Sequence, residues 1–183
     1  MNSNEPLAYR VRPKTLEEYV GQEHVIGEGK LLYRTIKADR LSSIILFGPP
    51  GCGKTSLARV ISETTKYKFY KINAVTAGVS DIKRVIEETK NFMLNPIGKS
   101  ILFIDEIHRF NKLQQDALLP YVENGTIILI GATTENPYFE VNKALISRSM
   151  VIKLEPLTTE NIYTVLKNAL KSKEGLRRIQ YKN

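Results

Sequence analysis

The sequence predicts an α/β protein built around a parallel sheet of five strands, with helices covering both faces in three layers. Short apolar segments with the composition of strands alternate along the chain with segments of helical periodicity, and right-handed crossovers between parallel strands require this order. The third segment is apolar at every position, as expected for a strand buried on both faces. The predicted strands are 43–47, 68–73, 101–104, 126–132 and 150–154.

Terminal signals and apolar spacing predict the helices between these strands. Thr15 or a neighbour can begin a short helix, and a second is expected at about 29–39. A helix from about Leu113 should end at Asn124-Gly125, a typical C-cap pair.

Two more helices are predicted from apolar residues that recur on one face. The first is capped at Ser80 or Asp81 and ends near Asn95-Pro96, and the second follows Pro156. The two faces comprise Ile82, Val85, Ile86, Thr89, Phe92 and Met93 in the first helix, and Ile162, Val165, Leu166, Ala169 and Leu170 in the second.

Composition limits the class of protein. The 183 residues, 42% hydrophobic and 25% charged, are enough for one soluble core. No apolar run approaches the length that spans a membrane, and no signal segment begins the chain. The single cysteine, Cys52, excludes an internal disulfide and suits a reducing cytoplasm, while two histidines are too few for a histidine-rich metal site.

Positive charge is concentrated at the end of the chain. The net charge is +8, and residues 161–183 contribute +5 of it, from six basic side chains against Glu174. Such a segment attracts nucleic-acid phosphates, but a solvated basic face explains it equally well. The basic residues are Lys167, Lys171, Lys173, Arg177, Arg178 and Lys182.

A glycine-rich loop between the first strand and the next helix carries the strongest chemical signal. It fits the pattern G-x-x-x-x-G-K-[ST], in which backbone N–H groups and the helix N-terminus surround phosphate oxygens. Lys54 can reach the β- and γ-phosphates, and the Thr55 hydroxyl can ligate Mg²⁺. Cys52 is small enough to fill its place without a chemical role. The loop reads Gly48-Pro49-Pro50-Gly51-Cys52-Gly53-Lys54-Thr55, and Ser56 continues into the helix.

Polar residues follow the third and fourth strands. Asp105 can hold Mg²⁺ through its water shell, and Glu106 can polarise an attacking water as general base. The fourth strand ends in Thr133-Thr134, where a hydroxyl can orient that water or touch the γ-phosphate. Arg148 follows a short helix, and its guanidinium can stabilise charge on a transferring phosphoryl group or be an ordinary surface arginine.

These motifs, in this order, resemble the AAA+ family of ATPases. Residues 48–55 resemble its Walker A motif and residues 101–106 its Walker B motif. Thr134 matches sensor 1, and Arg148 matches the arginine finger. Residues 10–22 resemble the strap on the adenine side of the nucleotide. The family's sheet order would place the fourth strand between the first and third, with Thr134 beside the γ-phosphate.

Within AAA+, the chain is similar to the RarA family of replication-associated recombination proteins, which has a relative that interacts with the Werner helicase. The similar segments are 103–123, 131–137, 139–142 and 144–148, within a resemblance that spans residues 7 to about 170. The stretch 136–142 is its most specific part.

The RarA resemblance implies an ATPase that uses ATP and Mg²⁺ at replication forks, DNA ends and single-strand gaps. Single-stranded-DNA-binding protein and the replication machinery are the implied partners. A homo-oligomer in the full-length form and a cytoplasmic, nucleoid-associated location without a membrane are also implied. Arg10 and Ser56 would join the loop in binding nucleotide, and Asn73 would restrain Glu106 until substrate binds.

The resemblance also divides the chain into three parts. Residues 1–40 form the strap, 41–156 the nucleotide-binding core, and 157–183 the first helix of an incomplete helical lid with a basic tail. Family members continue through a lid that carries a sensor-2 arginine and an oligomerisation region. We therefore expect this chain to be a fragment or a truncated reading frame.

Four other classes of protein are alternatives to this interpretation. A RuvB-type branch-migration motor shares the strap but inserts a hairpin before the fourth strand, where 123–126 leave no room. A clamp-loader subunit usually has cysteine where Ser149 follows Arg148. An unfoldase needs an aromatic pore loop, and 74–79 hold no aromatic residue. A nucleotide-binding module without turnover stays open, although the intact Lys54, Asp105 and Glu106 disfavour it.

Overall fold

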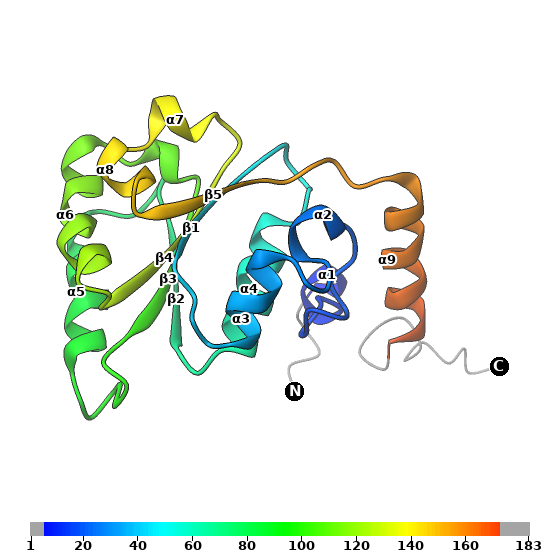
Figure 1. The fold of residues 1–183 in the computed structure, drawn as a ribbon, viewed down its shortest axis with the longest axis horizontal. Coiled ribbons are helices and arrows are strands. Elements are labelled where there is room, and N and C mark those ends of the chain that lie inside the picture. The colour runs from blue at the N-terminus through cyan, green and yellow to red at the C-terminus, as the bar shows by residue number, and fades with distance from the viewer. Residues whose placement is uncertain (1–5, 173–183) are drawn as a thin grey trace.

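The structure, a computed structural model, describes residues 6–172 and is organised around one parallel sheet (Figure 1). The strands are β1 Ser43–Phe47, β2 Lys68–Asn73, β3 Ser100–Asp105, β4 Ile127–Thr133 and β5 Ser149–Lys153. They lie in the order β2-β3-β4-β1-β5, and every pairing is parallel. The predicted sheet is confirmed, including the position of β4 between β1 and β3.

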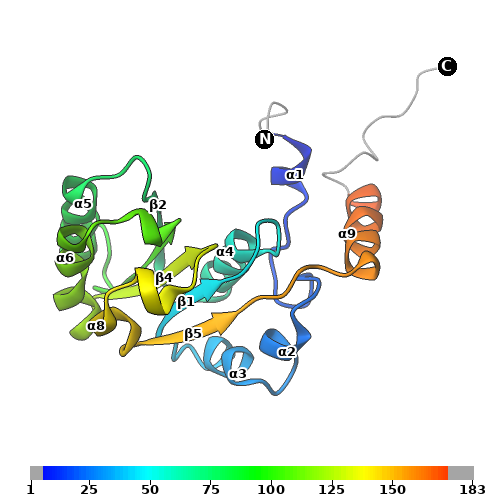
Figure 2. The same cartoon turned by 90° about the horizontal axis from the view of Figure 1, so that it is seen from above.

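Helices cover both faces of the sheet, which confirms the three layers (Figures 1 and 2). One layer contains α2 Glu23–Ile26, α3 Leu31–Lys37 and α4 Lys54–Thr64. The other contains α5 Val79–Lys90, α6 Lys112–Glu123 and α8 Lys143–Ile146. The remaining elements are α1 Leu7–Arg10, the 3-10 turn η1 Ile107–Arg109, α7 Pro137–Glu140 and α9 Thr159–Lys171.

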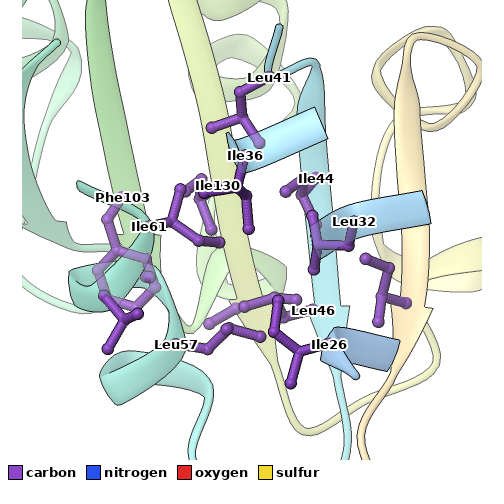
Figure 3. Close-up of a cluster of buried hydrophobic side chains, with 14 of the residues drawn as sticks. Ile26, Leu32, Ile36, Leu41, Ile44, Leu46, Leu57, Ile61, Phe103 and Ile130 are labelled. Atoms are coloured by element: carbon purple, nitrogen blue, oxygen red, sulfur yellow. The ribbon is translucent and has the colours of Figure 1, made fainter. Parts of the chain in front are cut away.

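Two apolar cores hold the layers together. The first lies between the sheet and α2–α4, where Leu32, Ile36 and Leu57 pack against Ile44 and Phe103 (Figure 3). The second joins the opposite face to α5, η1, α6 and α8. Burial on both faces explains why β3 and β4 are apolar along their length.

The predicted extension of α5 through Phe92 and Met93 is wrong. The helix ends at Lys90, and these two side chains are 73% and 88% exposed. Asn95 diverts the chain, because its buried amide donates hydrogen bonds to the carbonyls of Thr89 and Lys99 and to the Ser100 hydroxyl.

Cap residues in the sequence predicted the end of α6 correctly but misplaced the start of α5. The N-cap of α5 is Gly78 rather than Ser80 or Asp81, and the Gly78 N–H donates to the Asp81 carboxylate. At the end of α6, Asn124 is the C-cap and Gly125 has φ 74°, as the sequence predicts.

Thr15 does not begin a helix, contrary to the expectation. Its hydroxyl accepts a hydrogen bond from the Glu18 N–H, but only a turn follows, because the chain leaves it to bury Leu16 and Tyr19. The sequence analysis did not predict α1. The expected helix at 29–39 is present as α3.

Helix α9 confirms the prediction of a helix after Pro156, and it stands apart from the sheet in both views (Figures 1 and 2). Its predicted apolar face is largely in solvent, with Leu166 58% and Leu170 57% exposed. The basic residues from Lys173 onward lie outside the described part of the chain. Among residues 6–172, no helix combines the length and hydrophobicity needed to span a bilayer.

Candidate nucleotide site

The loop between β1 and α4 has the geometry of an anion-binding cradle. Gly51 and Gly53 have φ of 78° and 100°, a region that favours glycine. A side chain at Gly53 would also collide with Tyr19, because a Cβ there would lie 2.5 Å from the phenol oxygen. No side chain caps α4 within the described residues, so the N–H groups of its first turn can face an anion.

Lys54 places its ammonium at the loop itself. The residue is 8% exposed, and its Nζ donates to the carbonyl oxygens of Gly48 at 2.7 Å and Pro49 at 2.9 Å. Cys52 Sγ lies 3.7 Å from the same nitrogen. A phosphate oxygen can replace a carbonyl as acceptor, and the charge then stays beside the cradle.

Parallel pairing brings three strand ends to the same edge of the sheet. Phe47, the last residue of β1, pairs with Thr133, the last residue of β4. The Gly48 N–H donates to the Thr133 carbonyl at 3.2 Å, which ties the loop to β4. Asp105 ends β3, the next strand over. The loop, the acidic pair and the threonines therefore share one edge, as the sequence predicts.

Asp105 and Thr55 offer hard oxygen donors of the kind that Mg²⁺ prefers. The Asp105 carboxylate is 24% exposed and lies 3.8 Å from Lys71 Nζ. Thr55 is half-buried in the first turn of α4. Within residues 6–172, no three side chains of the His, Cys, Asp and Glu types cluster to hold a metal alone. These two residues thus suit a cation that is also held by phosphate oxygens.

Glu106 has an uncommon backbone conformation. Its φ of 57° and ψ of 45° lie in the left-handed region, which is rare for a glutamate. Its Oε2 lies 3.5 Å from His108 Nε2, and His108 Nδ1 lies 2.8 Å from Thr133 Oγ1. The sequence analysis assigned no role to His108. Thr134 follows Thr133 at this edge and is exposed.

Arg148 is not brought to this edge within one chain. It directly precedes β5, whose first residue pairs with Ser43 at the start of β1, so it lies at the opposite edge of the sheet. Five residues of strand separate the two edges by about 16 Å. The Arg148 guanidinium instead contacts Glu123, with Nη2 2.6 Å from Oε1, and donates to the Ala144 carbonyl.

Asn73 and Arg10 come from separate elements, because Asn73 ends β2 and Arg10 ends α1. Asn73 pairs with Asp105 at the end of β2, and its Oδ1 accepts a hydrogen bond from the Val75 N–H. Arg10 borders a cleft of about 680 Å³ between the leading segment, the loop and α9. Other residues lining the cleft include Lys14, Tyr19, Gly51, Gly53, Ser56 and Asn168.

Gln22 joins three separate segments at the loop, and the sequence analysis assigned it no role. Its buried Nε2 donates to the Cys52 carbonyl at 3.2 Å and to the Glu155 carbonyl at 2.7 Å. Its Oε1 accepts from the Glu155 N–H at 2.9 Å. No local pattern marks such a residue, because its partners lie 30 and 133 positions away.

Tyr19, like Gln22, contacts the loop from the leading segment. Its hydroxyl donates to the Gly53 carbonyl at 3.4 Å. Burial raises the pKa of the Tyr19 phenol well above its ordinary value, so the group is a neutral donor. The leading segment therefore fixes the loop from outside through two polar side chains.

Comparison with known proteins places this geometry in a family. Residues 44–156 match the family described as "ATPase family associated with various cellular activities (AAA)". The chain belongs to the AAA family. The matched span runs from β1 through β5 and contains the loop, Asp105, Glu106 and Arg148.

Among relatives of this AAA chain, the replication-associated recombination protein A of Haemophilus influenzae is 51% identical over 172 residues. The alignment covers 93% of the chain and 38% of that relative, and the Escherichia coli K12 protein gives the same identity over 94% and 38%. The ATPase WRNIP1 of Dictyostelium discoideum is 50% identical over 90% of the chain and 19% of its own length. The chain therefore spans well under half of these proteins.

Solved structures confirm the AAA+ P-loop fold. The Holliday junction branch migration motor RuvB of Thermotoga maritima superposes with a TM-score of 0.72 and 28% identity. The match covers 88% of the chain and 54% of RuvB. The resemblance to RarA proteins is likewise confirmed by the identities above.

A substitution at Gln22 tests whether the leading segment holds the loop between β1 and α4 in place. Asparagine tolerates the left-handed backbone of this residue (φ 63°) but is one methylene too short to keep the same contacts. Gln22→Asn should lower the free energy of unfolding by about 1–3 kcal/mol, since buried carbonyl and N–H groups lose partners. It should also weaken ATP binding, measured by urea unfolding and by titration with a fluorescent nucleotide. Glu23→Ala, one position along and exposed, is the control; equal effects of the two variants would contradict the assignment.

Proposed function

We propose that this chain is the nucleotide-binding core of a RarA-type ATPase that hydrolyses Mg-ATP to ADP and phosphate. One observation carries the proposal: the phosphate cradle, Asp105 and Glu106 meet at one edge of the sheet. The strap (residues 1–40) and the start of a lid (157–183) flank the core (41–156). The cleft bordered by Arg10 and Ser56 fits the adenine side of the nucleotide.

The residues divide the chemistry between binding and reaction. The loop N–H groups and Lys54 hold the phosphates, while Thr55 and Asp105 hold Mg²⁺. Bound Mg-ATP supplies the phosphoryl group that is transferred to water. Glu106 accepts a proton from that water, and Thr134 orients the water or contacts the γ-phosphate.

Asn73 would restrain Glu106 until substrate binds. The proposal is supported by its position, because β2 lies next to β3 and Asn73 pairs with Asp105. Asn73 Oδ1 accepts from the Val75 N–H, so the side-chain NH₂ group is the donor that can bond to the Glu106 carboxylate.

The proposed setting is DNA replication and recombination in the cytoplasm, at the nucleoid. The names of the bacterial relatives, at 51% identity, support it. Forks, DNA ends and single-strand gaps are the proposed substrates, with single-stranded-DNA-binding protein and the replication machinery as partners. The basic segment 161–183 is a proposed phosphate contact, although most of its charge lies outside the described residues.

A branch-migration motor or clamp-loader-type ATPase is the second candidate, favoured by the superposition on RuvB. Three residues join α6 to β4, which leaves no room for a hairpin there and favours the RarA-type function. A binding module without turnover is the third candidate, and the hydrolysis experiment below tests it directly.

Arg148 is proposed to act on the nucleotide of a neighbouring subunit in a homo-oligomer. Its place at the opposite edge of the sheet supports this proposal, since within one chain it faces away from the phosphate cradle. The exposed guanidinium contacts Glu123 and the Ala144 carbonyl in this chain, and a neighbour's nucleotide would take the place of these partners.

Two substitutions should separate binding from chemistry. Lys54→Ala should lose nucleotide affinity, because Lys54 contacts the phosphates in the ground state. Glu106→Gln should keep ATP bound while turnover falls by on the order of 10²-fold or more, since only the proton acceptor is lost. Labelled-nucleotide binding and phosphate release, with and without forked DNA, measure both effects. Hydrolysis by Glu106→Gln at the parent rate would refute the general-base role, and a parent chain that binds but never hydrolyses would be a binding module.

Mixing experiments test the proposed subunit contact. Arg148→Ala should reduce turnover on the order of 10³-fold in an assembly. Mixing it with Glu106→Gln subunits should restore part of the rate, because a site between different mutants can combine an intact Glu106 with an intact Arg148. The ATPase rate is measured against mixing ratio after subunit exchange is demonstrated. Absence of recovery at every ratio would contradict the trans role, and a large loss in a monomeric chain would indicate a cis role.

A further inference from the structure

The turn η1 packs against β4, and it carries His108. Ile107, its first residue, is fully buried. A Cβ at Gly131 of β4 would lie 2.9 Å from Ile107 Cδ1 and 2.8 Å from Ile45 Cδ1, so the Ile107 side chain packs closely on β4 at this glycine. The close approach of η1 to β4 fixes where the adjacent imidazole lies.

His108 bridges two groups of the candidate site. Its side chain is 9% exposed, with Nδ1 2.8 Å from Thr133 Oγ1 and Nε2 3.5 Å from Glu106 Oε2. Thr133 Oγ1 also accepts a hydrogen bond from the Glu135 N–H at 3.0 Å. The imidazole therefore lies between the end of β4 and the carboxylate that follows β3.

One proton arrangement of a neutral ring satisfies every group in this chain of contacts. A carboxylate only accepts, so the nitrogen facing Glu106, Nε2, carries the proton. Nδ1 then accepts from the Thr133 hydroxyl, whose lone pair remains available to the Glu135 N–H. The opposite tautomer would place a lone pair against the carboxylate and is disfavoured.

Thr133 also connects this network to the phosphate cradle. Its carbonyl accepts the hydrogen bond from the Gly48 N–H, and its hydroxyl meets His108. A continuous path thus runs from the first residue of the loop through Thr133 and His108 to Glu106. Glu106 itself lies in the left-handed region, a conformation that persists only when surrounding contacts hold it.

We propose that His108 is a positioning residue, which together with Thr133 holds the Glu106 carboxylate in one orientation toward the attacking water. This inference rests on the proposed function, in which Glu106 is the general base. It assigns to His108 no proton transfer with substrate. A histidine that only fills space beneath the edge would need neither the bond to Thr133 nor a proton on Nε2.

Nitrogen NMR of the histidine rings tests the network without requiring turnover. The chain has two histidines, so a His24→Gln variant assigns both sets of signals. At mildly alkaline pH, His108 should be the Nε2–H tautomer. Thr133→Val should produce a mixture of tautomers, whereas Thr133→Ser, which keeps the hydroxyl, should retain the single one. An Nδ1–H tautomer, or signals that do not respond to Thr133→Val, would overturn the proposal.

Steady-state kinetics then tests the expected effect of His108 on turnover. His108→Ala should lower kcat about tenfold, a fraction of what a general base contributes, with KM and ATP affinity unchanged. His108→Gln, whose amide can donate toward Glu106, should recover part of the loss. His24→Ala is the matched control and should match the parent, because His24 is exposed and its Nε2 lies 3.3 Å from the Lys153 carbonyl oxygen. An unchanged kcat in His108→Ala, or a change in KM alone, would overturn the positioning role. Parent-like hydrolysis by Glu106→Gln would instead overturn the proposed function.

Discussion

Parallel pairing of β1, β3 and β4 determines where each candidate group of the site lies. Because Phe47 pairs with Thr133 and β3 runs alongside β4, the residues that follow these strands emerge at one edge. The glycine loop, the acidic pair and the threonines need no long-range contact of their own to meet there. β3 and β4 are buried on both faces, so apolar packing from both helical layers stabilises these pairings.

The same strand register places the candidate nucleotide site and Arg148 at opposite ends of the strands. The candidate nucleotide-binding groups follow the carboxyl ends of the strands, whereas Arg148 directly precedes β5 at the amino ends. This position agrees with the proposal that Arg148 acts on another subunit's nucleotide. The apolar face of α9 is largely exposed among the described residues, with Leu166 58% and Leu170 57% exposed.

Features with local physical causes were predictable from the sequence, and those that depend on distant partners were not. The loop, Asp105-Glu106 and all five strands follow from periodicity and spacing, and the structure has them within about one residue. Gln22 and the His108–Thr133 pair could not be predicted, because their partners are brought together by the sheet. The end of α5 was missed for a similar reason, since Asn95 bonds to the next strand. The roles of the site residues stay predictions, those of the loop, Asp105, Glu106 and Arg148 as well as those of Thr134, Asn73 and Arg10.

A titration of the ¹⁵N-labelled chain with magnesium and a slowly hydrolysed ATP analogue tests the central claim, that one edge of the sheet holds the phosphates. The account predicts that the amide signals of Gly51, Gly53, Thr55 and Glu106 shift together and saturate with a single affinity. The amide of Arg148, at the other edge, should stay unchanged in the monomer. Saturable shifts that leave the loop amides unaffected, or that centre on the amino edge, would contradict it.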